Sequence, residues 1–494
     1  MKAASHSPSA ESSADSNQAI RLAALIQEDI YRQGLVPGAH IGTKPGLAAR
    51  YGVGPEIFRQ AASILEQRGI AEMQRGKLGG LVVTEPRPDA AAHVLATFFE
   101  FANVPFADFH AVNEPLQIVA YEAAAHAVSL RQADSWRRRL LGMAESEIAT
   151  WHGAFLSVDI RQEMVDSIGN PILSLLHQAM SLFFMDMIPL DRLDGPEGAE
   201  SLRLHLRQTS DLIEAIIAND VQSAHRISQE TSEFTSAREV DWRRMEDRFE
   251  IDRAKVDRGP KAGRWTVRWT LADKVAREIL RNIRSRGWPE GTYLGTEADL
   301  IQAYGVSRAT FRQAVRLLEH YSAAKMQRGS KGGLLVTAPD AEGVVELVVQ
   351  YLLRAKVTFD HARPSQIALQ TTAIGLLCGA ISRSALEDYR RRWDTLLSLR
   401  GEDLRVGLGG LQAFLVEQTG NRVLRTYWSI LVAIAAPAGI PEDIADDRIL
   451  AVASHILPAL GEALAAGDRT RARRAMINYL AEETCWLRPQ VERP

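Results

Sequence analysis

A short segment, residues 307–312, carries polar and basic side chains that suit contact with duplex DNA: Ser307, Arg308, Thr310 and Arg312. Ser307 can cap a helix, because its hydroxyl accepts a hydrogen bond from an amide two or three residues further on. Arg308 and Arg312 are four residues apart and would share one face of that helix. Their planar guanidinium groups match the O6/N7 edge of guanine and also bind phosphate. The spacing predicts the N-terminal end of a recognition helix in the major groove.

A glycine-rich turn with further basic residues follows this segment, and we interpret it as the tip of a wing: Arg328, Gly329, Lys331, Gly332 and Gly333. Glycine there permits close approach of the backbone to a groove. Residues 264–336 have a net charge of about +7, whereas the whole chain has a formal net charge of −3. The alternative is a solvated charged face. The local excess of positive charge favours nucleic acid instead.

The elements that must position these residues occur twice along the chain. Residues 51–84 and 304–337 align without a gap, from YGVGPEIFRQ and YGVSRATFRQ to GGLVVT and GGLLVT. A weaker match continues downstream, where SIGNPIL around Asn170 pairs with QTGNRVL around Asn421. The period of about 250 residues is far longer than a solenoid repeat and indicates a duplicated two-domain unit.

Each repeat begins with the pattern of a winged helix-turn-helix. In the first, apolar spacing predicts helices over 18–33, 47–51 and 55–67, followed by short antiparallel strands over 70–74 and 81–83. Later segments are amphipathic and predict a helical bundle: 89–104, 108–128, 131–147, 155–168, 171–187, 199–218 and 220–238.

The predicted fold is mainly α, with two winged helix-turn-helix domains (three helices plus a small β wing) alternating with two all-α ligand-binding bundles. The expected organisation is a disordered tail over 1–17, a winged domain over 18–86, a helical domain over 88–238, a linker over 239–268, a winged domain over 269–338 and a helical domain over 341–490.

The first winged unit has weaker chemistry for DNA. Its third helix starts at Pro55-Glu56 in place of a Ser-Arg pair, although proline suits the first helical position. Arg59 remains on the reading face, and Arg75, Gly76 and Lys77 would form the wing tip. The net charge over 18–83 is only about +3. We therefore expect DNA affinity to reside mainly in the second unit.

These motifs resemble the GntR superfamily, FadR subfamily, through YGVSRATFRQAVRLLE, MQRGSKGGLLV and their first-half counterparts, with IGNPIL and EAIIANDVQSAH resembling the FadR-type C-terminal (FCD) domain. The resemblance implies an operator-binding transcription regulator in the cytoplasm. Family members dimerise on a pseudo-palindromic operator, so one chain would hold both halves of a dimer. Members of the family usually have an arginine two residues before the leucine of the second helix. Pro45 and Ala298 stand at this position in the two repeats.

Many FadR-type domains bind a metal through an aspartate and three histidines. The matching positions are Ser157, Arg161, Thr209 and Thr231 in the first half and Leu408, Gln412, Leu457 and Tyr479 in the second. Neither set is a ligand set, so we expect no metal and no other cofactor. A one-turn shift of the alignment to His205 could restore part of a site. Relatives without metal bind acyl-CoA or another organic ligand, which implies a small organic effector of unknown identity.

The sequence shows few features of a membrane protein, a secreted protein or an enzyme. No run of about 20 apolar residues suggests a membrane span, and no signal-peptide core is present. No Gly-rich phosphate loop or nucleophile elbow is present, so we do not expect an enzyme. The pair Glu482-Glu483 is expected to face solvent.

Two alternatives stay open. The chain could be a non-catalytic ligand-sensing or corepressor scaffold with reduced DNA binding, as the weaker first unit suggests. It could also act as an intramolecular pseudo-dimer or as a homodimer with four winged units. The sequence gives neither the operator nor the direction of regulation.

Overall fold

The computed structural model describes most of the chain between residues 18 and 487. The positions left out within this span are 20, 24, 28, 31, 34, 68–69, 75, 77–78, 85–87, 144–150, 188–195, 232–270, 328–331 and 436–444. The tail expected over 1–17 and the linker expected over 239–268 lie outside the described residues. Contacts divide the chain into two compact units, Met1–His93 and Val94–Pro494.

The first unit packs helices against a three-stranded antiparallel sheet of order β1-β3-β2. Helical residues between 18 and 32 precede β1 (His40–Gly42), α2 (Lys44–Arg50), α3 (Pro55–Gln67), β2 (Ala71–Gln74) and β3 (Gly80–Val83). Ile26, Phe58 and Leu65 are fully buried in its core. Helix α2 begins before the expected residue 47, because Thr43 caps it and accepts a hydrogen bond from the Gly46 amide at 3.3 Å.

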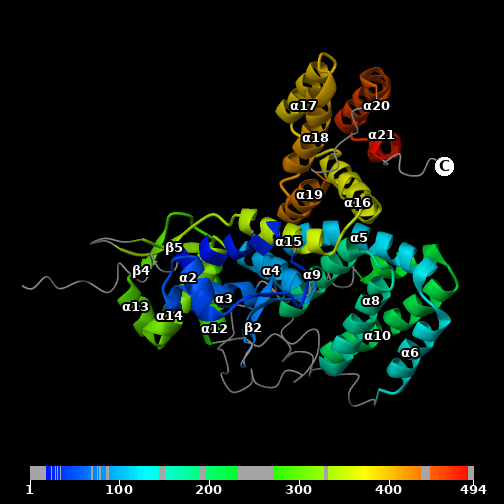
Figure 1. The fold of residues 1–494 in the computed structure, drawn as a ribbon. Coiled ribbons are helices and arrows are strands. Elements are labelled where there is room, and N and C mark those ends of the chain that lie inside the picture. Colours follow the sequence, from blue (N-terminus) through cyan, green and yellow to red (C-terminus); the bar gives the residue numbers. More distant parts are fainter. Residues whose placement is uncertain are drawn as a thin grey trace, which may run out of the picture. The chain divides into compact units, whose positions relative to one another are not determined.

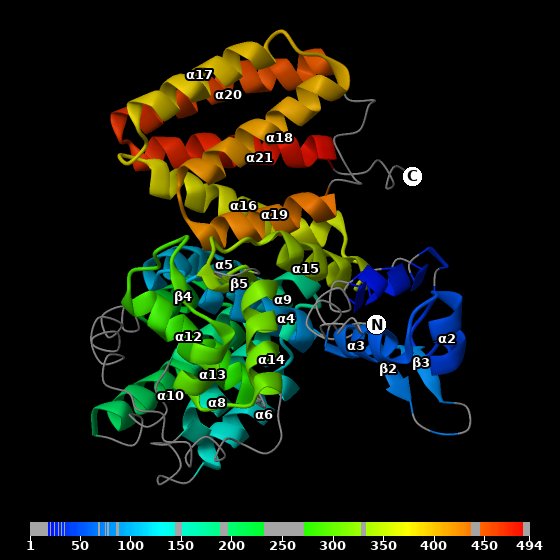
Figure 2. The same cartoon turned by 90° about the vertical axis from the view of Figure 1, so that its left-hand side faces the viewer.

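The second unit begins within the connecting helix α4 (Pro88–Phe101) and contains another segment with the same order of elements. These are α12 (Leu271–Ser285), β4 (Tyr293–Gly295), α13 (Glu297–Tyr304), α14 (Arg308–His320), β5 (Ala324–Gln327) and β6 (Gly333–Val336), drawn in green in Figure 2. The sheet order is β4-β6-β5. Gly305 ends α13 in the left-handed conformation with φ 61°, where glycine avoids the usual steric penalty.

The prediction of two strands per wing was incomplete, because β1 and β4 add a third strand to each sheet. The close approach of β1 to β3, and of β4 to β6, explains one glycine in each repeat. A Cβ atom at Gly333 would collide with the Gly295 carbonyl oxygen and the Tyr293 ring, and Gly80 has the same relation to β1. Gly333 thus allows a neighbouring strand to approach, and its predicted place at the wing tip is corrected to the start of β6.

Two sets of helices complete the second unit (Figure 1). The first, cyan to green, comprises α5 (Phe106–Ala127), α6 (Leu130–Leu141), α8 (Trp151–Asp166), α9 (Pro171–Met187), α10 (Pro196–Ile217) and a helix over 221–231. The second, yellow to red, comprises α15 (Glu342–Arg354), α16 (Phe359–Leu377), α17 (Arg383–Leu396), α18 (Gly401–Gln418), α19 (Arg422–Ala435), α20 (Asp446–Ala466) and α21 (Arg469–Leu487). The mainly α fold with small antiparallel sheets is confirmed.

The two bundles meet through α5 and α16, which pack against each other. Asn170 donates from Nδ2 to the His361 carbonyl oxygen at 2.9 Å, and Asn421 donates to the Asp108 carbonyl oxygen at 2.8 Å. Asp108 and His361 are each the third residue of their helix. The contacts are therefore reciprocal, as they are across the two-fold axis of a symmetric dimer.

The winged segment of the second unit packs on the end of α4. Arg277 forms an ion pair with Glu100, with 2.8 Å between Nη2 and Oε2, and Arg284 donates to the Glu100 carbonyl oxygen. The rings of Phe101 and Tyr321 lie 4.8 Å apart. Residues of α12 and the residue that ends α14 thus anchor this winged segment to the helix that precedes the first bundle.

One described helix, α20, is long and apolar enough to cross a membrane by length and composition alone. Its Ile449, Ala453, Leu457 and Leu460 are buried in the core of the second bundle. This packing is typical of the core helix of a bundle, so the membrane reading has weak support.

Candidate nucleic-acid interface and ligand cavity

The N-terminal end of α14 has the predicted cap. Ser307 is the N-cap residue, and its Oγ atom accepts a hydrogen bond from the Thr310 amide at 3.2 Å. The hydroxyls of Ser307 and Thr310 lie 2.9 Å apart. The cap satisfies one of the free amides of the first turn. It leaves the first turn of α14 exposed, which suits contact with base edges.

Arg308 and Arg312 converge on one carboxylate, that of Glu297. Their Nε atoms lie 2.9 Å and 2.8 Å from Glu297 Oε1. The Arg308 side chain is 64% exposed and the Arg312 side chain 35% exposed, so both remain accessible. Hydrogen bonds from Arg308 and Arg312 lower the pKa of Glu297, which is therefore ionised at neutral pH. The sequence did not predict the role of Glu297. This residue is the first of α13, and the turn between α13 and α14 brings it next to Arg308 and Arg312.

The first unit distributes the same charges differently. Arg59 bonds to Glu56 of its own helix, with Nε–Oε2 at 3.0 Å and Nη2–Oε1 at 2.5 Å, and both side chains are exposed. Lys44 stands where the second repeat has Glu297. The carboxylate that pairs with the reading-face arginines thus lies on α13 in the second unit and on α3 in the first unit. In the first unit it pairs with a single arginine, Arg59.

The wing tips are described only in part. Gly76 lies between β2 and β3, Gly332 lies just before β6, and Gly76 has φ 124°, a conformation that favours glycine. The predicted contact residues Arg75, Lys77, Arg328, Gly329 and Lys331 lie outside the described residues.

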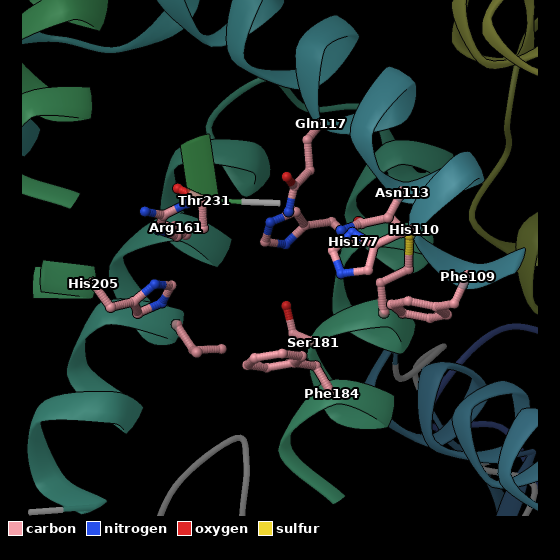
Figure 3. Close-up of a pocket in the computed structure, with 12 residues that line it drawn as sticks. Phe109, His110, Asn113, Gln117, Arg161, His177, Ser181, Phe184, His205 and Thr231 are labelled. Atoms are coloured by element: carbon pink, nitrogen blue, oxygen red, sulfur yellow. The ribbon is translucent and has the colours of Figure 1, made fainter. Parts of the chain in front are cut away.

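The first bundle contains a partly open cavity of about 60 Å³ (Figure 3). Its lining includes aromatic side chains from α5 and α9 and polar side chains from α5, α8, α9 and α10. Aromatic, histidine and arginine side chains of this lining are Phe109, His110, Arg161, His177, Phe184 and His205.

The positions that the resemblance assigned to metal ligands lie together in this bundle. Ser157 Oγ lies 2.6 Å from Thr209 Oγ1, which also accepts a hydrogen bond from Arg161 Nε at 2.9 Å. Arg161 and Thr231 both line the cavity. Within the described ranges, no three His, Cys, Asp or Glu side chains are grouped as metal ligands. A hydroxyl pair and a guanidinium group thus stand at three of the four assigned positions.

Three histidines of the cavity are neutral at physiological pH. Burial lowers the pKa of His110 to about 4. Burial, and secondarily the charge of Arg161, lowers the pKa of His177 to about 4 and that of His205 to about 3. His177 Nδ1 lies 2.8 Å from Gln162 Oε1. These rings can donate or accept hydrogen bonds but carry no charge.

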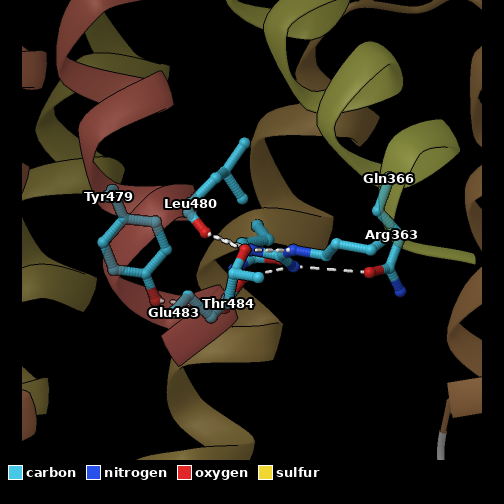
Figure 4. Close-up of polar contacts among 7 residues, drawn as sticks. Arg363, Gln366, Tyr479, Leu480, Glu483 and Thr484 are labelled. Carbon is cyan, nitrogen blue, oxygen red and sulfur yellow. Dashed lines mark hydrogen bonds and ion pairs between the residues drawn. The ribbon is translucent and has the colours of Figure 1, made fainter. Parts of the chain in front are cut away.

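The second bundle has a buried ion pair (Figure 4). Arg363 and Glu483 lie 2.9 Å apart between Nη1 and Oε2, and each side chain is only 7% exposed. Gln412 Nε2 donates to Glu483 Oε1, which the Tyr479 hydroxyl approaches to 3.4 Å. Arg363 also donates from Nε to Thr484 Oγ1 at 2.7 Å and from Nη2 to the Leu480 carbonyl oxygen. The expectation that Glu483 faces solvent was wrong, because an arginine 120 residues away in the chain pairs with it.

The geometry of residues 271–336, three helices and a small antiparallel sheet, is that of a winged helix-turn-helix domain. Residues 271–332 match the family described as "Bacterial regulatory proteins, gntR family". The second winged segment is thus a GntR-family helix-turn-helix domain.

Comparison with solved structures finds GntR-type regulators. Streptococcus agalactiae GntR aligns at 18% identity and a TM-score of 0.33, covering 43% of this chain and 98% of that one. E. coli McbR/YncC aligns at 14% identity and a TM-score of 0.25, covering 44% and 98%. No curated protein matches the chain.

Proposed function

We propose that the chain is a cytoplasmic DNA-binding transcription regulator of GntR/FadR type, whose binding to an operator is modulated by a small organic ligand in the helical domains. The observation that carries the proposal is the first turn of α14, where a capped helix presents Arg308 and Arg312 on a GntR-family domain. Both arginines are accessible and lie on a segment of net charge about +7. Arginines at this end of a recognition helix can bind guanine edges and phosphates.

Salt dependence tests the DNA-binding function. Binding to DNA from upstream of the chain's own gene should weaken at least about tenfold between roughly 50 mM and 200 mM salt, because Lys and Arg release counterions from phosphates. A gel-shift titration at several salt concentrations measures this slope. Failure to bind at the lowest salt concentration would refute the proposal.

A non-catalytic ligand sensor or corepressor scaffold is the second candidate. It is favoured by the pairing of every described reading-face arginine with a carboxylate, Arg308 and Arg312 with Glu297 and Arg59 with Glu56. If these pairs persist next to DNA, they leave little charge for phosphates. The same titration separates the two functions, because a scaffold would show neither tight binding nor a salt slope.

We further propose that one chain, as a tandem duplication, supplies both halves of a dimer and binds an asymmetric operator. The reciprocal bonds of Asn170 and Asn421 support this, since Asn170 reaches the third residue of α16 and Asn421 reaches the third residue of α5. One half-site would be read by Arg308 and Arg312, and the other would be held mainly through phosphates.

The mass of the complex tests this arrangement. Native mass spectrometry or light scattering on a minimal operator should find one chain per duplex, because single-unit relatives need two chains to supply two recognition helices. Two chains per duplex would support the homodimer with four winged units instead. Equal sequence sensitivity of both half-sites in footprinting would also contradict the asymmetry.

A further inference from the structure

The cavity of the first bundle contains a buried arginine, Arg161, with one nitrogen that no described residue satisfies. Arg161 is 4% exposed; its Nε atom donates to Thr209 Oγ1, whereas its Nη2 atom is buried with no hydrogen-bond partner among the described residues. Leaving a guanidinium group buried and unpaired is costly, because the group has lost its water and gained no counter-charge. Among the described lining residues, Arg161 alone carries a formal charge at neutral pH. The cavity is therefore suited to an anion.

The acidic groups nearest in sequence to Arg161 bond elsewhere. Asp159 and Glu163 both accept hydrogen bonds from Arg139, at 2.6 Å and 2.7 Å. Asp166 accepts from Ser174 Oγ at 2.5 Å. The carboxylates of α8 are thus committed to contacts that support the bundle.

The second bundle shows what fills the corresponding place. Gln412 stands at the position of Arg161 and Tyr479 at the position of Thr231, when the repeats are aligned on their Asn-Pro-Ile-Leu and Asn-Arg-Val-Leu segments and on their last helices. Arg363 is the fifth residue of α16, as His110 is of α5. All three residues of the second bundle contact the Glu483 carboxylate.

A carboxylate from the chain itself therefore occupies this place in the second bundle. The aligned position in the first half is Thr235, which has no carboxylate. The arginine also lies on a different helix in each bundle: Arg363 is on α16 in the second bundle, and Arg161 is on α8 in the first. One bundle contains a complete arginine–carboxylate pair, and the other contains the arginine and a cavity.

We propose that the first bundle binds one small carboxylate per chain, with Arg161 as its counter-charge and no metal ion, whereas Glu483 permanently occupies the matching place in the second bundle. The inference rests on the proposed ligand-sensing function and names the class of ligand. Arg161 pairs with the carboxylate, and the neutral histidines offer further hydrogen bonds. Phe109 and Phe184 contact the apolar part of the ligand.

The size of the cavity limits that apolar part. Its volume of about 60 Å³ is well below the ~150 Å³ of an engineered apolar cavity that binds benzene. The ligand should accordingly be a short-chain acid. Propionate is a suitable probe, with acetate and hexanoate as shorter and longer members of the series.

Calorimetry on the full chain without DNA tests the proposal independently of operator binding. In buffer with EDTA at neutral pH, sodium propionate should bind with one site per chain, whereas sodium chloride and sodium phosphate should give no specific binding. Arg161→Gln, which installs the residue found in the second bundle, should weaken binding at least about tenfold, since it removes a charge-assisted hydrogen bond. Arg226→Gln is the control that removes an exposed arginine of the same bundle, and it should keep the affinity.

Each other outcome overturns the proposal. Two sites per chain would show that the second bundle is also open. Loss of binding in EDTA would show that a metal ion is required, and stronger binding of phosphate would change the class of ligand. Unchanged binding by Arg161→Gln would remove the assigned counter-charge. Glu233 lies two residues before Thr235 in the sequence, so much tighter binding by Glu233→Gln would show that a carboxylate of the chain already fills the first cavity. If propionate fails to bind while operator binding holds, only the carboxylate inference falls.

Discussion

Replacing Glu483 by alanine should lower the free energy of unfolding of the second bundle by about 3–5 kcal/mol, because the change leaves a buried charge without its partner. Arg363 and Glu483 are each only 7% exposed, so water cannot replace the lost carboxylate without rearrangement. The change also removes the acceptor of Gln412 and Tyr479. Urea denaturation followed by tryptophan fluorescence and circular dichroism measures the loss.

Two controls separate the buried charge from the mere loss of a side chain. Glu417→Ala removes the partner of Arg425 in a pair that is about half exposed, and it should change stability by less than about 1 kcal/mol. The double variant Arg363→Met/Glu483→Leu should recover most of the stability, because an apolar pair of similar volume often replaces a buried ion pair without loss. A loss below about 1 kcal/mol for Glu483→Ala would contradict the assigned role.

Chemical rescue connects this variant with the ligand cavity. Glu483→Ala leaves space beside Arg363, so added acetate or propionate should restore part of the lost stability by binding only the folded protein. Chloride at the same ionic strength should not. Rescue would show that this place in the fold accepts a free carboxylate, as we infer for the first bundle.

Local patterns predicted most helices of the chain, and long-range contacts account for what they missed. Apolar spacing placed α3 and α9 correctly, because an amphipathic helix is encoded within its own residues. Strands β1 and β4 escaped prediction, since each has only three residues and alternation needs a longer run. The Gly80 and Gly333 positions were the available signal, because a strand that lacks Cβ there permits close approach of its neighbour.

In the candidate sites, too, the sequence predicted local features but not contacts between distant residues. The cap of α14 could be predicted from Ser307 and Thr310, which are three residues apart. The pairing of Arg308 with Glu297 and that of Arg363 with Glu483 could not, because each joins different helices. A single sequence contains no signal for which distant charges meet, so Glu483 was assigned to the surface by its local polarity.

Arg308→Ala should weaken operator binding by about 1–3 kcal/mol and relax base preference at one position of one half-site, as expected for the loss of an arginine that reads a base edge. The operator can be defined by selection from random-sequence duplexes, and competition assays with single-base variants then measure the preference. Arg312→Ala should have a similar effect, since both arginines lie on the first turns of α14 and share Glu297. Arg59→Ala should cost less, because the first unit lacks the Ser-Arg pair and has a net charge of only about +3 over residues 18–83.

Glu297 should affect the preference for the operator sequence and the affinity for DNA of any sequence in different ways. In the free protein it fixes the two guanidinium groups side by side, so Arg308 arrives at the groove already ordered and loses less side-chain freedom on binding. Glu297→Gln should therefore keep or increase affinity for DNA of any sequence, because it removes a negative charge, while it lowers the preference for the selected operator. Glu387→Gln, which likewise removes a negative charge, from a 62% exposed side chain of α17, is the control for net charge and should leave base preference unchanged. If Arg59→Ala proved more damaging than Arg308→Ala, the first winged unit would be the main reader, and the assignment of base contacts to α14 would be wrong.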